Sequence, residues 1–149
     1  MGITLERELM DWLKTSLQIE TRGKGMQEIT DQIQSVVREW NIQDGVCFLF
    51  LSHTSASLVT CEAYDPNARH DVEEFYERLA PERQSWYQHT LEGSDDSPSH
   101  IRATLTQSNL TIPIDDGCLS LGTWQGIFLF EHRSHPHRRE LLIRCLKVS

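Results

Sequence analysis

Three histidines from separate parts of the chain carry the clearest potential for chemistry. His89 and His100 are eleven positions apart in a polar stretch, and His132 lies beyond the motif GTWQG of residues 122–126. Zinc binds imidazole nitrogen at about 2.0–2.1 Å, and a catalytic zinc typically has three protein ligands and one open position. Three converging imidazoles would therefore form a metal centre. The alternative is a set of loop histidines that bind backbone carbonyls.

Carboxylates and a fourth histidine are the candidates for acid–base chemistry. His53 follows an apolar segment and could act as a general base with Ser55 or Ser57 as the nucleophile, or form a polar wall of the pocket. Glu62 ends the next apolar segment and is a candidate acid, base or ligand. Asp96 lies between the first two histidines, where it is expected to act beside them or to orient one of them.

A second group of residues has the chemistry to bind a ligand. Trp124 could stack on a flat ring and Gln125 could hydrogen-bond to it, although a tight strand junction explains the same motif. Hydroxyls and amides at Thr54 and Ser55 are candidates for holding a phosphate, and Arg139 could clamp an anion or solvate a strand edge. All these residues are expected to meet in one polar pocket.

Composition excludes several classes of protein. Fourteen basic and 22 acidic residues give a net charge of −8, which argues against broad contact with nucleic-acid phosphates. No apolar run approaches the roughly 20 residues of a membrane-spanning helix, and charged residues interrupt the N-terminal segment, so no secretory signal is predicted. The four cysteines form no CxxC pair and are expected to be buried free thiols in the cytoplasm.

The elements that must position these residues are predicted from periodicity and turn signals. Apolar residues at helical spacing predict a helix over 27–40, and Asp65 and Pro66 predict the start of a second helix. This second helix is expected to bury Val72, Phe75, Tyr76 and Leu79. A short helix is expected over 101–105, and strands are expected over 12–20, 46–52, 55–62, 110–114, 118–122, 126–132 and 140–148.

These elements predict one α+β domain over residues 1–149, with residues 1–12 as an N-terminal extension. The expected architecture is a compact, sandwich-like sheet arrangement with two main helices. The sheet is expected to be largely antiparallel, because the second half of the chain is mostly successive strands. Segment 46–52 should be a central strand covered on both faces. A sheet this large leaves apolar faces or edges to be covered, and oligomerisation is one way to cover them.

Five segments resemble the YjbQ family, also called UPF0047. They are HTSASL (53–58), E-x-x-D-P (62–66), H-T-x-E-G-x-D-D-x-P-x-H (89–100), LTIP (110–113) and L-x-L-G-T-W-Q-G-I-x-L-x-E-H-R (119–133). The resemblance runs from about residue 13 to the C-terminus. Ala63 departs from the pattern, since the family usually has asparagine there, and this affects any step that would need an amide at that position.

The resemblance implies an α+β fold, a homotrimer and a histidine-lined site for a divalent metal. His89, His100 and His132 match family histidine positions and are the expected metal ligands, while His53, Glu62 and Asp96 match polar ones. Histidine ligands favour zinc, with magnesium or manganese as alternatives. Some family members are expected to have a weak thiamine-phosphate synthase activity.

Three functional hypotheses follow from these expectations. The first is a metal-dependent enzyme that joins a pyrimidine diphosphate to a thiazole phosphate, releasing pyrophosphate. The second is a metal-dependent hydrolase of a small phosphorylated compound. The third is a non-catalytic trimeric protein that binds a metabolite or metal in the same pocket. No nucleic-acid or membrane partner is expected.

Overall fold

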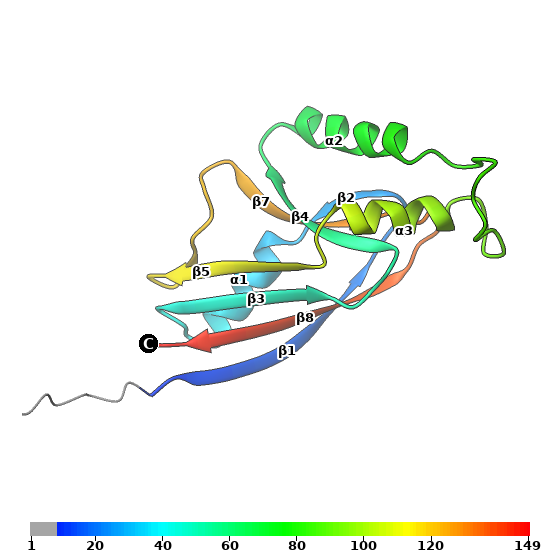
Figure 1. Cartoon of the computed structure of the whole chain (residues 1–149). Coiled ribbons are helices and arrows are strands. Elements are labelled where there is room, and N and C mark those ends of the chain that lie inside the picture. Colours follow the sequence, from blue (N-terminus) through cyan, green and yellow to red (C-terminus); the bar gives the residue numbers. More distant parts are fainter. Residues whose placement is uncertain (1–8) are drawn as a thin grey trace, which may run out of the picture.

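Two antiparallel β-sheets form the frame of the molecule in this computed structural model, which describes residues 9–149 (Figure 1). The larger sheet has the order β1 (Asp11–Glu20), β8 (Arg138–Lys147), β3 (Gly45–Leu51), β5 (Asn109–Asp115) and β6 (Cys118–Leu119). The smaller sheet has the order β2 (Gly25–Glu28), β7 (Gln125–Glu131) and β4 (Ala56–Glu62). The α+β class and the antiparallel sheets predicted from the sequence are confirmed.

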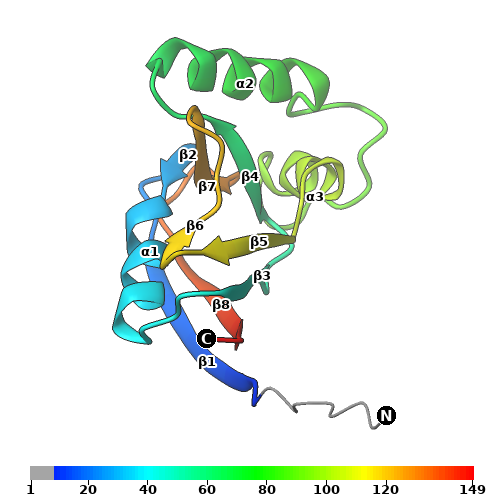
Figure 2. The same cartoon turned by 90° about the vertical axis from the view of Figure 1, so that its left-hand side faces the viewer.

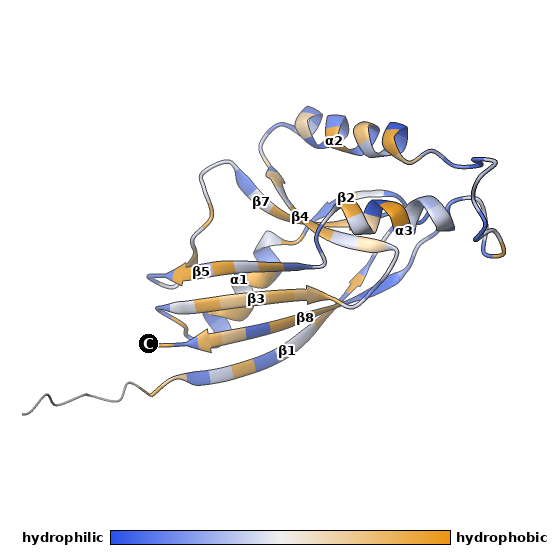
Figure 3. Ribbon diagram, viewed as in Figure 1, coloured by the Kyte–Doolittle hydropathy of each residue, from blue (hydrophilic) through white to orange (hydrophobic). Residues whose placement is uncertain are grey.

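In residues 9–149, helices lie against these sheets, as two perpendicular views show (Figures 1 and 2). Helix α1 (Thr30–Glu39) lies beside the larger sheet, and α2 (Pro66–Leu79) lies over the smaller one. Helix α3 (Asp96–Leu105) follows a long loop that is mostly hydrophilic (Figure 3). The main core lies between α1 and the inner faces of both sheets, and a second, smaller cluster joins α2 to Phe128 and Phe130 of β7.

Strand β3 alternates between the core and solvent. Cys47, Leu49 and Leu51 are buried, whereas Phe48 and Phe50 on the opposite face are 37% and 48% exposed. The expectation that this strand is covered on both faces is therefore wrong for the isolated chain. The seven-residue apolar run reflects a buried inner face together with an apolar outer face.

The first helix begins later than predicted, because the residues before it pair with a strand that is distant in the sequence. Residues 27 and 28, predicted as the start of a helix, pair with Leu129 and Phe128 as part of β2. Asp65 caps α2 as predicted, through a 2.9 Å bond from the N–H of Asn67. However, the predicted stripe on α2 is only partly buried: Val72 and Tyr76 pack on the smaller cluster, whereas Phe75 and Leu79 are exposed.

Three other expectations are corrected. Helix α3 begins at Asp96 rather than at residue 101, and β6 contains only two residues. Of the four free cysteines, Cys118 is exposed and Cys61 is half-buried, so only the other two are core residues. The predicted N-terminal extension falls largely on residues 1–8, outside the described residues. In the described part of the chain, no helix is both long and apolar enough to cross a bilayer.

Candidate metal centre

His89, Asp96 and His100 form one compact cluster at the N-terminal end of α3. Nε2 of His89 lies 2.6 Å from Oδ2 of Asp96, and Nε2 of His100 lies 3.1 Å from the same oxygen. Each residue offers a ligand atom, and the three atoms lie within 4.8 Å of one another. Asp96 is buried, whereas the two imidazoles reach the surface. Their arrangement leaves one side of the cluster open to a ligand.

The local sequence explains how this cluster forms. Asp96 and His100 are four residues apart, so α3 places both side chains on one helical face. The first turn of a helix also favours a carboxylate. His89 reaches the same point from the long loop before α3. The sequence signal for this pair is the four-residue spacing of Asp96 and His100. The spacing indicates a shared face only when the helix is known to begin at Asp96.

Arg133 holds the carboxylate of Asp96 in place through an ion pair. Its Nη1 donates to Oδ1 of Asp96 at 2.7 Å, and its Nε donates to Oδ2 of Asp95 at 2.9 Å. Burial would raise the pKa of Asp96, but the bond from His89 and the charges of His100 and Arg133 outweigh it, so the pKa lies below its ordinary value. Sequence reasoning did not assign Arg133 this role.

The tautomer of His100 is fixed by a backbone carbonyl. Nδ1 of His100 lies 2.8 Å from the oxygen of Thr54, which can only accept, so Nδ1 carries a proton. In the neutral ring, Nε2 then presents a lone pair to the carboxylate oxygen of Asp96. Two electron-rich atoms 3.1 Å apart are stable only with a cation or a proton between them. Metal-binding histidines commonly use such a carbonyl to orient the ring.

A pocket of about 580 Å³ opens in front of this cluster. Its walls include His53 and Thr54 from the β3–β4 loop, together with His89, His100 and one side of α3. With Asp96 of the cluster, the structure therefore brings five of the predicted site residues to one place. In the described part of the chain the walls contain no lysine or arginine, so a bound anion would need positive charge from an ion or from a neighbouring residue.

An adjoining pocket of about 440 Å³ shares His53 and Thr54 and adds Ser55 and Arg139. Arg139 is only 4% exposed, and its guanidinium donates to Ser55 and to the buried carboxylate of Glu131. Arg139 was predicted to hold an anion. In the fold, most of its donors already have partners inside the protein, and sequence reasoning missed Glu131 as the main one.

His132 is not part of the cluster, so the expected set of three histidine ligands is corrected. Its ring is fully buried against Phe130, and Nε2 lies 2.9 Å from the hydroxyl of Ser57. Burial, followed by the charges of Arg102 and Arg139, lowers its pKa to about 3. Nδ1 has no hydrogen-bond partner among the described residues. In the cluster, the third potential ligand beside His89 and His100 is Asp96.

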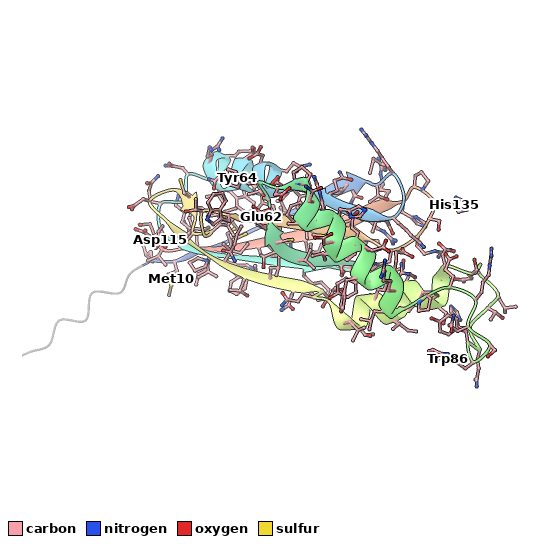
Figure 4. All side chains as sticks on the ribbon, turned by 90° about the horizontal axis from the view of Figure 1, so that it is seen from above. Met10, Glu62, Tyr64, Trp86, Asp115 and His135 are labelled. Atoms are coloured by element: carbon pink, nitrogen blue, oxygen red, sulfur yellow. The ribbon has the colours of Figure 1, made fainter. Side chains whose placement is uncertain are left out.

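Glu62, Trp124 and Gln125 lie at the other end of the smaller sheet. Glu62 pairs with Gln125 in the β4–β7 register, six residues along β4 from Ala56, which corresponds to roughly 20 Å. Figure 4 shows Glu62 near the end of the molecule marked by Asp115, away from Trp86 on the loop that leads to His89. Within one chain, these three residues therefore lie apart from the cluster of His89, Asp96 and His100, and the residues predicted to share a single pocket do not all meet.

Local contacts explain the conformation of these three residues. The carboxylate of Glu62 accepts the N–H of Asp65, and the amide oxygen of Gln125 accepts the N–H of Gly122 at 2.8 Å. Trp124 is 61% exposed and contacts Tyr64 edge to face. Gln125 stabilises the strand junction, which agrees with the structural alternative considered for GTWQG.

Comparison with known proteins identifies the family. Residues 15–148 match the family described as UPF0047 protein YjbQ-like. A UPF0047 protein of Synechocystis is 46% identical over 127 residues, covering 85% of this chain and 86% of that protein. YjbQ of Escherichia coli O157:H7 is 38% identical over 132 residues, covering 88% of this chain and 95% of that protein.

Solved structures give the same result. A YbjQ-like protein of unknown function from Sulfolobus solfataricus has a TM-score of 0.84 at 26% identity, covering 93% of this chain and 99% of that one. A conserved hypothetical protein from Thermus thermophilus has a TM-score of 0.79 at 31% identity, covering 87% and 98%. This chain belongs to the YjbQ (UPF0047) family.

Proposed function

We propose that this protein binds a divalent metal ion through His89, Asp96 and His100 and acts on a small phosphorylated compound. The observation that carries the proposal is the orientation of His100, whose Nδ1–H is bound to Thr54 so that Nε2 faces Asp96. Two imidazoles and one carboxylate suit zinc, and the same donor set also occurs in non-haem iron sites. Magnesium and manganese are the alternative ions.

The residues around the cluster have distinct roles in this proposal. Arg133 holds the carboxylate of Asp96, and Thr54 holds the ring of His100. A bound divalent ion would supply positive charge to a phosphate oxygen or lower the pKa of a bound water. His53 also lines the pocket, where it can orient a substrate.

The proposed reaction is transfer of the pyrimidine group of a pyrimidine diphosphate to a thiazole phosphate with release of pyrophosphate, as in a thiamine-phosphate synthase. Hydrolysis of a phosphorylated compound is the rival reaction, and binding without turnover is the non-enzymatic alternative. Rescue of a thiamine auxotroph by the wild type but not by His89→Ala would support the transferase. Rescue by both proteins would contradict a role for this site.

Metal analysis of untagged protein tests the metal itself. The wild type should contain stoichiometric metal, and His89→Ala and Asp96→Ala should lose it. His70→Ala is the matched control, because His70 is an exposed histidine on α2 that lies outside the cluster. A wild type that stays metal-free after incubation with zinc, manganese or iron would contradict the proposal, as would full retention in His89→Ala.

We also propose that the protein is a homotrimer, as the family resemblance implies. The supporting observation is the outer face of the larger sheet, where Trp12 packs against Phe48 with ring centroids 5.8 Å apart. Trp12 is 55% exposed, and Phe50 continues the same apolar face. Exposed aromatic side chains grouped on one sheet face are typical of an interface between subunits. Arg144 and Lys14, in register with Phe48, add positive charge to this face.

A further inference from the structure

In the described chain, one nitrogen of the Arg139 guanidinium has no hydrogen-bond acceptor. Nε donates to Glu131 Oε2 at 2.7 Å, and Nη2 donates to Glu131 Oε1 and to the hydroxyl of Ser55 at 2.9 Å. The carboxylate thus occupies one edge of the guanidinium. In the described chain, the remaining nitrogen, Nη1, has a single polar neighbour, Nδ1 of His53, at 3.5 Å.

The tautomer of His53 shows that this neighbour is not an acceptor. The backbone N–H of Glu140 donates to Nε2 of His53 at 2.8 Å, so Nε2 carries no proton. A neutral imidazole must then carry its proton on Nδ1. Burial, followed by the charge of Arg139, lowers the pKa of His53 against the opposing carboxylates of Glu131 and Glu140, which favours the neutral ring. The contact between Nη1 and Nδ1 therefore joins two donors.

Two donors at this separation can share one acceptor. An oxygen atom about 2.8–2.9 Å from each nitrogen satisfies both hydrogen bonds when the nitrogens are 3.5 Å apart. The space for it exists, because both residues line the pocket of about 440 Å³, together with Thr54 and Ser108. Both donors face this pocket, so an oxygen acceptor from outside the protein can satisfy them.

We propose that His53 and Arg139 form a binding site for a phosphate group, with Nδ1–H and Nη1–H donating to the same oxygen. A phosphate oxygen suits the site because it accepts several hydrogen bonds and matches the charge of a guanidinium. The site adjoins the metal pocket, since both pockets share His53 and Thr54. If the protein acts on a phosphorylated compound as proposed above, this site would hold the phosphate of the substrate beside the metal. The catalytic role of the site, but not phosphate binding itself, rests on that proposed function.

Inorganic phosphate and metal-free protein provide the test. The full chain is treated with a chelator and titrated with phosphate while NMR follows the side-chain N–H groups of His53 and Arg139. Both sets of signals should shift with a common affinity. This measurement uses the wild type, so it does not depend on the folding of any variant. Absence of these shifts at saturating phosphate would overturn the proposal.

Variants separate this site from the metal centre. His53→Ala should weaken phosphate binding by about tenfold or more, whereas His70→Ala should bind phosphate like the wild type. With both proteins free of metal, His89→Ala should bind phosphate as the wild type does, because His89 does not line this second pocket, so failure of the metal proposal leaves this inference standing. Unchanged phosphate affinity in a folded His53→Ala variant would contradict it.

Discussion

His100 donates its Nδ1–H to the backbone carbonyl of Thr54 over 2.8 Å, joining helix α3 to the loop between β3 and β4. This bond crosses 46 positions of the sequence and sets which nitrogen faces Asp96. His53, the neighbour of Thr54, lines the same pocket as His89 and His100. One hydrogen bond thereby sets the tautomer of a candidate ligand and joins two of the segments that line the pocket.

Arg133→Ala should weaken metal binding without removing a ligand. Its guanidinium orients Asp96 through Oδ1, and loss of such a supporting contact typically costs about 10–100-fold in metal affinity. Competition with a chromophoric chelator measures the change. Arg138→Ala is the control, because Arg138 is exposed and its ion-pair partner is Glu20, on another strand. Equal affinities in the wild type and Arg133→Ala would show that Asp96 does not need this support.

Breaking the ion pair between Glu131 and Arg139 should strongly destabilise the fold. Both side chains are nearly fully buried, so Arg139→Met leaves a carboxylate without its counter-charge. Removing one partner of such a pair typically costs about 3–5 kcal/mol. Urea unfolding measures this cost, and Arg138→Met, one residue away and exposed, should change stability by less than about 0.5 kcal/mol.

The double variant Glu131→Gln/Arg139→Met completes the cycle. Its loss of stability should be clearly smaller than the sum of the two single losses, because neither charge is left alone. Additive losses would mean that the two side chains stabilise the fold independently of each other.

Much of the fold could be predicted from local pattern, because the strands carry periodic or continuous apolar segments. Strand β3 and the cap at Asp65 depend on near neighbours in the sequence, and both were predicted. Strand β2 could not be, since its pairing partner lies about a hundred residues away in β7. The long motifs were specific enough to indicate the family, and the match over residues 15–148 confirmed it.

The candidate site was predicted only in part, for a related reason. His89 and His100 were paired correctly, but the helix that adds Asp96 begins five residues earlier than its apolar pattern indicates. His132 shares a strand end with Arg133, and only burial distinguishes them: one ring enters the core while the neighbouring guanidinium turns to Asp96. Sequence spacing does not specify which of two adjacent side chains points inward.

Phe50→Glu should disrupt the proposed trimer. Phe50 is 48% exposed on the outer face of the larger sheet, so the isolated chain tolerates a charge there. A carboxylate buried in an apolar interface between subunits is strongly unfavourable. Sedimentation equilibrium of the wild type should give the trimer mass, and the variant should give a smaller species. Leu91→Glu, on the loop before α3, is the control at a fully exposed apolar residue. A wild-type monomer would contradict the proposal outright.

His132 should make the protein sensitive to mild acid. Its folded-state pKa of about 3 lies below the ordinary value of 6.5, so between these values the unfolded chain binds a proton that the folded chain does not. Stability from this group is therefore complete above pH 6.5 and is lost as pH falls towards 3, by up to about 1.4 kcal/mol per pH unit.

The variant His132→Gln isolates this contribution, because glutamine keeps a polar group near Ser57 but does not titrate. Urea unfolding at pH 7 and pH 5 should show a loss of stability in the wild type that exceeds the loss in the variant by about 1–2 kcal/mol. His70→Gln, at an exposed position on α2, should behave like the wild type. Parallel losses in the wild type and His132→Gln would mean that the buried imidazole takes up its proton in the folded state as readily as in the unfolded one.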